Sequence, residues 1–300
     1  MQLSIVWWNT SLSPAKKPGL ATEQDKAIAF HLIELLTMQH AIDIICLGEM
    51  SACDVEQMRS DCALDGYAIY EGMSKVGASR FDVCVLFRSE RLALLETEQI
   101  VPRTGNKLMK IGQRLDFAVD DQDVMHLFVS HWPSRLWCEE NHADRHAFGL
   151  YLRQAVEAVL GPDFTSHVVV LGDFNDDPFA QSLEHHLMAT RDRALARHSR
   201  HLMYNPFWRH LAANTAHPRR TTEPSHAGSY FYESGKRTKW HTFDQIIFSS
   251  SFLGHSSWKL NEDKVGIIDL PEYTELVASQ KGRFDHLPVT ATIEKETLNG

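Results

Sequence analysis

One stretch constrains the fold of this chain more than any other, and it runs from His167 to Pro178 with the sequence HVVVLGDFNDDP. The β-branched and apolar run from Val168 to Leu171 is typical of a strand that is buried on both faces. Gly172 then leads directly into a cluster of short polar side chains. The stretch therefore places carboxylates at the end of a buried strand.

Two explanations account for different polar residues of this turn. Asp177 followed by Pro178 is a typical N-cap and first-turn pair, and it predicts a helix to about Met188. Capping gives no reason for Asp173 or Asn175. In a strand-end turn, Asp173 can accept a proton from water and Asn175 can donate a hydrogen bond to an anionic oxygen. A turn that is merely polar is the alternative.

Polar side chains recur at the ends of other predicted strands. Early in the chain, three apolar runs end in Asn9, Glu49 and His131. Late in the chain the order is reversed, because Asp244 and Asp285-His286 precede their apolar runs. If the early strands run antiparallel to the late ones, these ends share one edge of a sheet. We therefore expect the side chains to converge.

Taken together, these motifs resemble those of the endonuclease/exonuclease/phosphatase superfamily, which includes pancreatic deoxyribonuclease and exonuclease III. A lone Gly-Asp-Phe-Asn is a moderate signal, whereas an ordered set that spans nearly the whole chain is a specific one: Asn9, Glu49, His131, Asp173-x-Asn175, Asp244 and Asp285-His286. The resemblance implies an α/β fold, a four-layer sandwich of two packed, mostly antiparallel β-sheets flanked by helices.

The resemblance also implies a metal-dependent phosphoric ester hydrolase. Glu49 would hold Mg²⁺, with Mn²⁺ as a substitute. Asn9 and Asp285 would assist as further oxygen ligands, which suit a hard cation. A carboxylate at the entry of a helix is the alternative reading of Glu49.

The remaining matched residues would be catalytic. Asp173 would position and deprotonate water, and Asn175 would bind a non-bridging phosphate oxygen. His286, oriented or kept cationic by Asp244, would stabilise developing charge, and His131 would contact the phosphate or protonate the leaving oxygen. A satisfied core histidine is the alternative for both histidines.

The chain departs from the family's deoxyribonuclease branch at one position. That branch has a glutamate that orients the histidine matching His131, on the strand that matches Phe81 to Phe87. No glutamate stands there in this sequence. Asp82 is the candidate substitute. The sequence therefore does not specify which side chain orients His131.

Periodicity predicts the scaffold around these motifs. Helices are expected at 22–40, 51–64 and 141–160, with Thr22, Ser51 and Asn141 at their starts. Strands at 67–72, 81–88, 92–97, 114–119 and 124–131 are expected to form a meander that completes the first sheet. Strands at 228–232, 243–249 and 287–293 would complete the second sheet. The other histidines lack the companion ligands of a zinc site and are expected at the surface or at caps.

Composition sets outer limits. With 300 residues, of which 43% are hydrophobic and 23% charged, the chain can form one sizeable core, and its candidate residues are spread from end to end. We therefore expect a single domain over residues 1–300. The first apolar run is too short for a signal peptide or a membrane span, and the five cysteines show no paired spacing. These features predict a cytoplasmic protein that does not contact membranes.

The formal charge of −9 hides an asymmetry. Residues 191–241 carry ten cations against three acids, which makes this stretch +7 and the remainder −16. Aromatic residues lie between the cations, and this mixture suits a phosphate backbone with stacked bases. A solvated basic loop is the alternative. We treat 191–241 as a basic aromatic insertion. Its stretch 202–225 is too long for a simple connection between two elements, and we expect this stretch to face the substrate. The substrate-binding candidates are Ser134, Arg135, Arg219, Arg220 and Trp240.

The sequence therefore predicts a divalent-metal-dependent phosphodiesterase, and a nuclease that hydrolyses DNA is the leading interpretation. A phosphatase or a lipid phosphodiesterase, of the inositol polyphosphate or sphingomyelin type, could use the same site, because loops set the substrate. A binding module without catalytic activity is a third alternative. No protein partner can be inferred.

Overall fold

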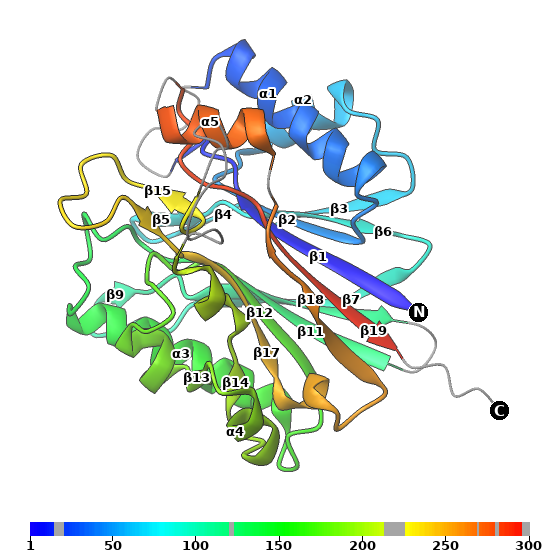
Figure 1. The fold of residues 1–300 in the computed structure, drawn as a ribbon, viewed down its shortest axis with the longest axis vertical. Coiled ribbons are helices and arrows are strands. Elements are labelled where there is room, and N and C mark those ends of the chain that lie inside the picture. The colour runs from blue at the N-terminus through cyan, green and yellow to red at the C-terminus, as the bar shows by residue number, and fades with distance from the viewer. Residues whose placement is uncertain (15–20, 120–122, 213–225, 269, 280–281, 296–300) are drawn as a thin grey trace, which may run out of the picture.

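The computed structural model describes residues 1–14, 21–119, 123–212, 226–268, 270–279 and 282–295. Two mixed sheets pack face to face, and helices cover their outer faces (Figure 1). The expected fold class is therefore confirmed. Most strand pairs are antiparallel, and the exceptions are the parallel pairs β1–β2, β11–β12 and β13–β14.

The first sheet contains six strands. Its order is β18 (Trp258–Ile267), β19 (Val289–Lys295), β1 (Gln2–Asn9), β2 (Ile44–Gly48), β6 (Cys84–Arg88) and β3 (Tyr67–Glu71). The helices α1 (Glu23–Glu34), α2 (Ala52–Asp61) and α5 (Pro271–Ser279) lie on its outer face (Figure 1).

The second sheet contains seven strands. Its order is β13 (Ala189–Thr190), β14 (Met203–Tyr204), β17 (Asp244–Ser249), β12 (His167–Asp173), β11 (Asp123–His131), β10 (Gly112–Val119) and β7 (Leu92–Ile100). The helix α3 (Ala143–Leu160) packs on its outer face, and α4 (Arg193–His198) lies beside β13 and β14.

The remaining elements of the described residues are short. Three hairpins are formed by β4 (Ser74–Val76) with β5 (Ser79–Phe81), β8 (Arg103–Thr104) with β9 (Lys107–Leu108), and β15 (Tyr230–Phe231) with β16 (Trp240–His241). Short π-helical turns span Leu35–Gln39 and Ser182–His186, and 3₁₀ turns span Pro206–His210 and Ser250–Leu253.

The core has three layers because the central strands are buried on both faces. In β12, Val169 and Leu171 belong to the core between the sheets, whereas Val168 and Val170 pack under α3. A strand covered on both sides reads as a continuous apolar run rather than as an alternating one. This explains why the HVVVL segment stands out in the sequence.

Three expectations about strand order were wrong. The strand expected at 228–232 does not join the second sheet, because β15 pairs with β16 in a separate two-stranded sheet. The strands from Tyr67 to His131 do not form one meander, because β3 and β6 join the first sheet while β7, β10 and β11 join the second. The last strand, β19, pairs with β1 in the first sheet rather than completing the second. Alternating hydrophobicity marks a strand, but it does not specify which neighbour the strand pairs with.

Helix starts agree with capping chemistry at two of three sites. Thr22 with Asp25 and Ser51 with Asp54 form capping boxes. His142 rather than Asn141 caps α3, and Gly161 ends it with a φ of 70°. The expected helix from Asp177 to Met188 was wrong, because only a π-helical turn at Ser182–His186 forms there. The Asp177 carboxylate instead accepts hydrogen bonds from the Thr242 backbone and the His241 ring.

Among the helices of the described ranges, none is long and apolar enough to cross a lipid bilayer.

Gly172 is required where β12 meets β11. Its φ is 147°, and a Cβ atom placed there would lie 1.8 Å from the Ser130 carbonyl oxygen. We predict that Gly172→Ala lowers the free energy of unfolding by at least about 2 kcal/mol, because the clash is with backbone that cannot move aside. Denaturant unfolding followed by circular dichroism measures this change.

Gly66→Ala is the matched control. Gly66 also has a positive φ, 82°, but no atom lies within 4 Å of the added Cβ. It should therefore cost only about 1 kcal/mol, the strain of the backbone conformation. Equal losses in the two variants would show that the contact with Ser130 is unimportant.

Candidate active site

Strand register places three of the expected residues in one row. His131 at the end of β11 is the partner of Asp173 at the end of β12. Asp173 is in turn the partner of Asp244 at the start of β17. Because β11 and β12 are parallel and β17 is antiparallel to them, the two strand ends and the strand start meet at one edge of the sheet.

The first sheet brings the other residues to the same place. Asn9 is the last residue of β1, Glu49 follows β2, and Asp285 and His286 lie just before β19. A cavity of about 210 Å³ joins the two sheet edges, and seven of the eight predicted catalytic and metal residues line it: Asn9, Glu49, His131, Asp173, Asn175, Asp285 and His286. We call this cavity the catalytic pocket. Asp244 lies behind it, next to His286.

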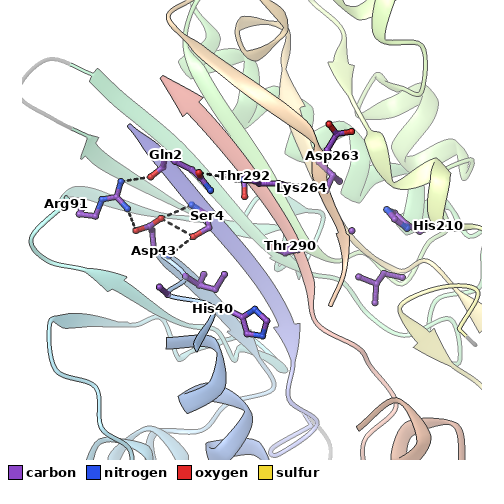
Figure 2. Close-up of a pocket in the computed structure, with 15 residues that line it drawn as sticks. Gln2, Ser4, His40, Asp43, Arg91, His210, Asp263, Lys264, Thr290 and Thr292 are labelled. Carbon is purple, nitrogen blue, oxygen red and sulfur yellow. Dashed lines mark hydrogen bonds and ion pairs between the residues drawn. The ribbon is translucent and has the colours of Figure 1, made fainter. Parts of the chain in front are cut away.

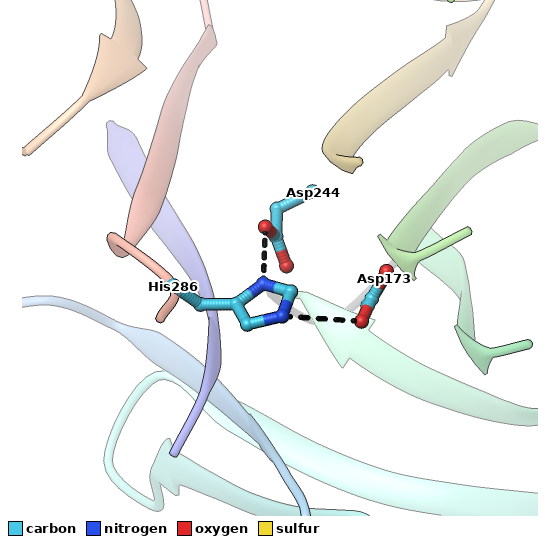
Figure 3. Close-up of side chains that lie close together, drawn as sticks. All are labelled: Asp173, Asp244 and His286. Atoms are coloured by element: carbon cyan, nitrogen blue, oxygen red, sulfur yellow. Dashed lines mark hydrogen bonds and ion pairs between the residues drawn. The ribbon is translucent and has the colours of Figure 1, made fainter. Parts of the chain in front are cut away.

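His286 lies between two aspartates (Figure 3). Its Nδ1 atom is 2.7 Å from Asp244 Oδ2, and its Nε2 atom is 3.6 Å from Asp173 Oδ2. The Trp7 indole donates to the other Asp244 oxygen at 2.7 Å, which fixes that carboxylate. Burial would lower the pKa of His286, but the surrounding carboxylates raise it well above its usual value.

His131 is held in a similar way by Asp82. Its Nδ1 atom lies 3.0 Å from Asp82 Oδ2, and the buried Lys110 ammonium lies 3.1 Å from Asp82 Oδ1. Burial alone would raise the pKa of the Asp82 carboxyl, but His131 and Lys110 hold it below its usual value. Asp82 therefore occupies the orienting position for which the sequence offered no glutamate. Lys110 was not anticipated.

Asp173 is the point at which the two histidines meet. His131 Nε2 is 3.8 Å from Asp173 Oδ2, and the Asn9 amide donates to the same oxygen at 3.2 Å. The backbone N–H of Asn175 donates to Asp173 Oδ1 at 2.8 Å. Burial raises the pKa of Asp173, although the cationic form of His286 opposes this shift. A buried carboxylate with a raised pKa is suited to accept a proton.

Glu49 is a partly buried acid with few polar neighbours. Burial raises its pKa to about 7. Its closest ionisable partner is His131, at 4.0 Å from Nε2 to Glu49 Oε1. Its φ of 54° lies in a region that residues other than glycine rarely adopt, which is a strain found mainly at functional positions. A largely desolvated carboxylate that lines the pocket and lacks close donors is suited to a cation.

Asp285 lies on the same side of the pocket as Glu49. It accepts a hydrogen bond from the Ser11 hydroxyl at 2.9 Å. Its charge also contributes to the raised pKa of Glu49. Together with the Asn9 amide oxygen, the two carboxylates form an oxygen-rich donor set that suits Mg²⁺ or Mn²⁺.

A second arrangement could also hold a metal ion. Ligand-type atoms of Asp173, Asp244 and His286 lie within 4.8 Å of one another. In this trio, however, Trp7 and His286 already occupy both oxygens of Asp244. A cation there would have to displace one of these hydrogen bonds, whereas the Glu49 carboxylate is open.

Two arginines support the loop that carries Asn175. The Asn175 side chain donates to the Trp132 carbonyl at 3.0 Å, and its φ is 51°. The fully buried Arg145 donates to the carbonyls of Phe174, Pro133 and Cys138. Arg135 donates to the Asn175 carbonyl and contacts Asp176. Arg145 was missed because an arginine inside a helical pattern normally indicates an exposed face.

The predicted substrate-binding residues occupy different places. Ser134 lines the catalytic pocket, whereas Arg135 is engaged with the 175–177 turn and the Phe243 ring. Trp240 packs on Phe231, with ring centroids 5.0 Å apart, beside the core under α5. Arg219 and Arg220 lie outside the described residues.

Three arginines of the described part of the basic stretch contact other residues of the fold. Arg193 and Arg209 both pair with Glu262 of β18, and Arg191 lies over the Trp208 ring. These cations are therefore engaged within the fold. The pocket is also lined by four residues that were not predicted: Ser11, Pro14, Arg283 and, from the basic aromatic insertion itself, Tyr230. The Tyr230 ring lies 4.7 Å from the His286 ring.

The contact between Asp82 and Lys110 generates a test. We predict that Asp82→Asn lowers the free energy of unfolding by about 3–5 kcal/mol, because it leaves the Lys110 ammonium buried without its carboxylate. Adding Lys110→Met should recover most of this loss. Denaturant unfolding of both single variants and the double variant gives the coupling. A double variant no more stable than Asp82→Asn would show that the lost partner of His131, not Lys110, causes the instability.

Comparisons with known proteins agree with this geometry. Residues 28–300 match the model of the endonuclease/exonuclease/phosphatase family. A search of curated protein sequences found no match. Among solved structures, the catalytic domain of human Nocturnin with bound sulfate is 17% identical, with a TM-score of 0.60 over 98% of this chain and 95% of that one.

Two further solved structures are similar over nearly their full lengths. D. rerio TDP2 in complex with a single-strand DNA product is 18% identical, with a TM-score of 0.60 over 98% of this chain and 99% of that one. A Bacteroides thetaiotaomicron mannosyl-6-phosphatase is 13% identical, with a TM-score of 0.57 over 97% of this chain and 99% of that one. At these identities the likeness shows the fold alone. The family match over most of the chain goes further, and this protein belongs to the endonuclease/exonuclease/phosphatase family of phosphoesterases.

Proposed function

We propose that this protein is a divalent-metal-dependent phosphodiesterase whose substrate is a nucleic acid, with DNA as the leading candidate. One observation carries the proposal. Two histidines, each held by its own aspartate, point their Nε2 atoms at the same oxygen of Asp173 beside Glu49. A phosphoryl group bound here would have a histidine donor on each of two sides and a base, Asp173, between them.

Glu49, Asp285 and the Asn9 amide oxygen would hold the metal. The fit rests on the Glu49 carboxylate, whose closest ionisable partner, His131, is 4.0 Å away and whose pKa is raised to about 7 by burial and by the nearby charge of Asp285. When bound, Mg²⁺ or Mn²⁺ would neutralise charge on the phosphoryl oxygens.

The remaining roles follow from the hydrogen bonds. Asp173, fixed by Asn9 and by the Asn175 backbone, orients the attacking water and accepts its proton. The Asn175 amide has a second N–H beside the one given to Trp132, and this donor binds a non-bridging oxygen.

The two histidines act on the developing charge. His286 is kept cationic by Asp244 and stabilises the pentacovalent phosphorane. His131 is held by Asp82 with its Nε2 atom towards the pocket, and it donates a proton to the leaving oxygen.

The size of the pocket suits a phosphoryl group rather than a whole substrate. A volume of about 210 Å³ is below the range of roughly 300–1,000 Å³ that is usual for sites that enclose a whole small ligand. The pocket therefore suits a phosphoryl group whose two substituents extend outside it. The similarity to TDP2, which was solved with a single-strand DNA product, supports nucleic acid, and the similarity to a mannosyl-6-phosphatase supports a small phosphate ester as the alternative.

A cytoplasmic location is part of this proposal. All five cysteines are free, and four of them are buried. Free buried thiols are typical of proteins that function in a reducing compartment.

A substrate panel tests the proposal. Supercoiled plasmid, linear duplex, single-stranded DNA, RNA, inositol polyphosphates and sphingomyelin should each be incubated with Mg²⁺, with Mn²⁺ and with EDTA. We expect hydrolysis of nucleic acid with either metal and none with EDTA. Glu49→Gln is the control, because it keeps the side-chain size but should weaken Mg²⁺ binding in calorimetry. Hydrolysis confined to inositol phosphates or sphingomyelin would support the alternatives.

Asp173→Asn separates catalysis from binding. We predict a loss of at least roughly 100-fold in turnover with little change in substrate affinity, because the amide cannot accept the proton of water. Single-turnover kinetics together with oligonucleotide binding measure the two effects. Near-normal turnover would remove Asp173 from the role of base.

A further inference from the structure

A larger groove opens from the catalytic pocket. It has a volume of about 1040 Å³ and shares six lining residues with the pocket: Pro14, Glu49, His131, Ser134, Tyr230 and Asp285. We call it the side groove. Because the catalytic pocket is small and continuous with the side groove, a substituent on the phosphoryl group has this direct path outward.

The two walls of the side groove differ in chemistry. One wall is the β4–β5 hairpin, which contributes the exposed Lys75 and the partly exposed Arg80. The other wall is the loop after β11, which contributes Leu136 and Trp137. Lys110 also lines the side groove and pairs with Asp82 at 3.1 Å, which offsets the charge of this carboxylate towards an anion. The lining of the side groove thus combines a cationic segment with an apolar one.

The apolar wall is exposed and yet held in place. Leu136 is 73% exposed and Trp137 is 67% exposed. The Trp137 backbone N–H donates to the Ser134 carbonyl at 2.9 Å. Arg145 donates to the carbonyls of Pro133 and Cys138, which lie on either side of Leu136 and Trp137 in the chain. Exposed large apolar side chains on a braced loop beside an active site are typical of a binding surface.

We propose that a single strand of nucleic acid lies in the side groove, with its phosphates facing Lys75 and Arg80 and one base stacked on Trp137. The proposal rests on the proposed function and names the form of its substrate. A cationic wall along an aromatic platform is the arrangement that binds single strands without regard to sequence. The bases of a duplex are stacked on one another and cannot lie on Trp137, so the platform selects unpaired nucleotides.

A lipid surface fits the side groove less well. Anchoring in a bilayer interface requires a broad apolar face, whereas two exposed apolar side chains here share one groove with two cations. Charge complementarity therefore favours a polyanionic strand.

Another cavity of comparable size provides a control (Figure 2). It has a volume of about 830 Å³ and lies beside β1, β18 and β19. Its charges are largely paired within the fold, because Arg91 contacts Asp43 and Lys264 contacts Gln2 and Glu294. Lys264 is a matched partially exposed lysine outside the side groove.

The experiment measures binding separately from hydrolysis. Fluorescence anisotropy with a labelled oligothymidylate in EDTA, so that the probe stays intact, gives the affinity of the wild type and its variants. We expect Trp137→Ala to weaken binding roughly 5- to 150-fold, as for the loss of one stacked base, and Trp137→Phe to retain most of the affinity. Lys75→Ala should weaken binding and flatten its salt dependence, whereas Lys264→Ala should change neither. Duplex of the same length should bind more weakly and should not respond to Trp137→Ala.

Each contrary result has a distinct meaning. Unchanged oligothymidylate affinity in Trp137→Ala, or equal losses for duplex and single strand, would overturn the proposal. Binding of the wild type to phosphatidylserine–phosphatidylcholine vesicles that is lost in Trp137→Ala, with oligonucleotide binding unaffected, would overturn it in favour of a lipid surface. Hydrolysis is assayed separately with Mg²⁺. A wild type that binds oligothymidylate through Trp137 but cleaves no nucleic acid would overturn the proposed function alone.

Discussion

The buried carboxylate of Asp173 is the interaction on which the site depends. A charge at this depth is costly unless donors surround it. Here the donors come from both sheets, because Asn9 and His286 belong to the first sheet and its approach, whereas His131 and the Asn175 backbone belong to the second. The two sheets must therefore pack with their polar edges in register for Asp173 to be stable and usable.

The groups that hold the two histidines also need hydrogen-bond partners of their own. Each histidine that faces Asp173 is held by its own aspartate, and each aspartate is fixed by another donor, Trp7 for Asp244 and Lys110 for Asp82. Buried polar networks of this kind stabilise only when every member is satisfied. Glu49 is the exception, because its pKa rises to about 7 and its backbone is strained. Local instability at that position is what a cation would relieve.

Substrate choice depends on features around this network rather than on the network itself. The basic aromatic stretch looked like the substrate-facing segment, but Arg193 and Arg209 pair with Glu262 and Arg191 stacks on Trp208. The side groove beside the pocket instead combines cations on the β4–β5 hairpin with the exposed Trp137. Opposite charges far apart in the chain can cancel in the fold, and therefore a local excess of charge does not locate a surface.

The sequence by itself determined the fold class and the residues that meet in the pocket, because strand ends carry a local signature of an apolar run followed by Asn9, Glu49, His131 or Asp173. It also indicated the capping boxes at Thr22 and Ser51, which depend only on residues three apart. Only the tertiary structure decided which sheet β7 and β19 join, and it replaced the expected cap at Asp177 with contacts to Thr242 and His241. It likewise decided that Lys110 supports Asp82 and that Trp137 lines the side groove. These features arise from contacts between segments distant in the chain, whose partners no local pattern specifies.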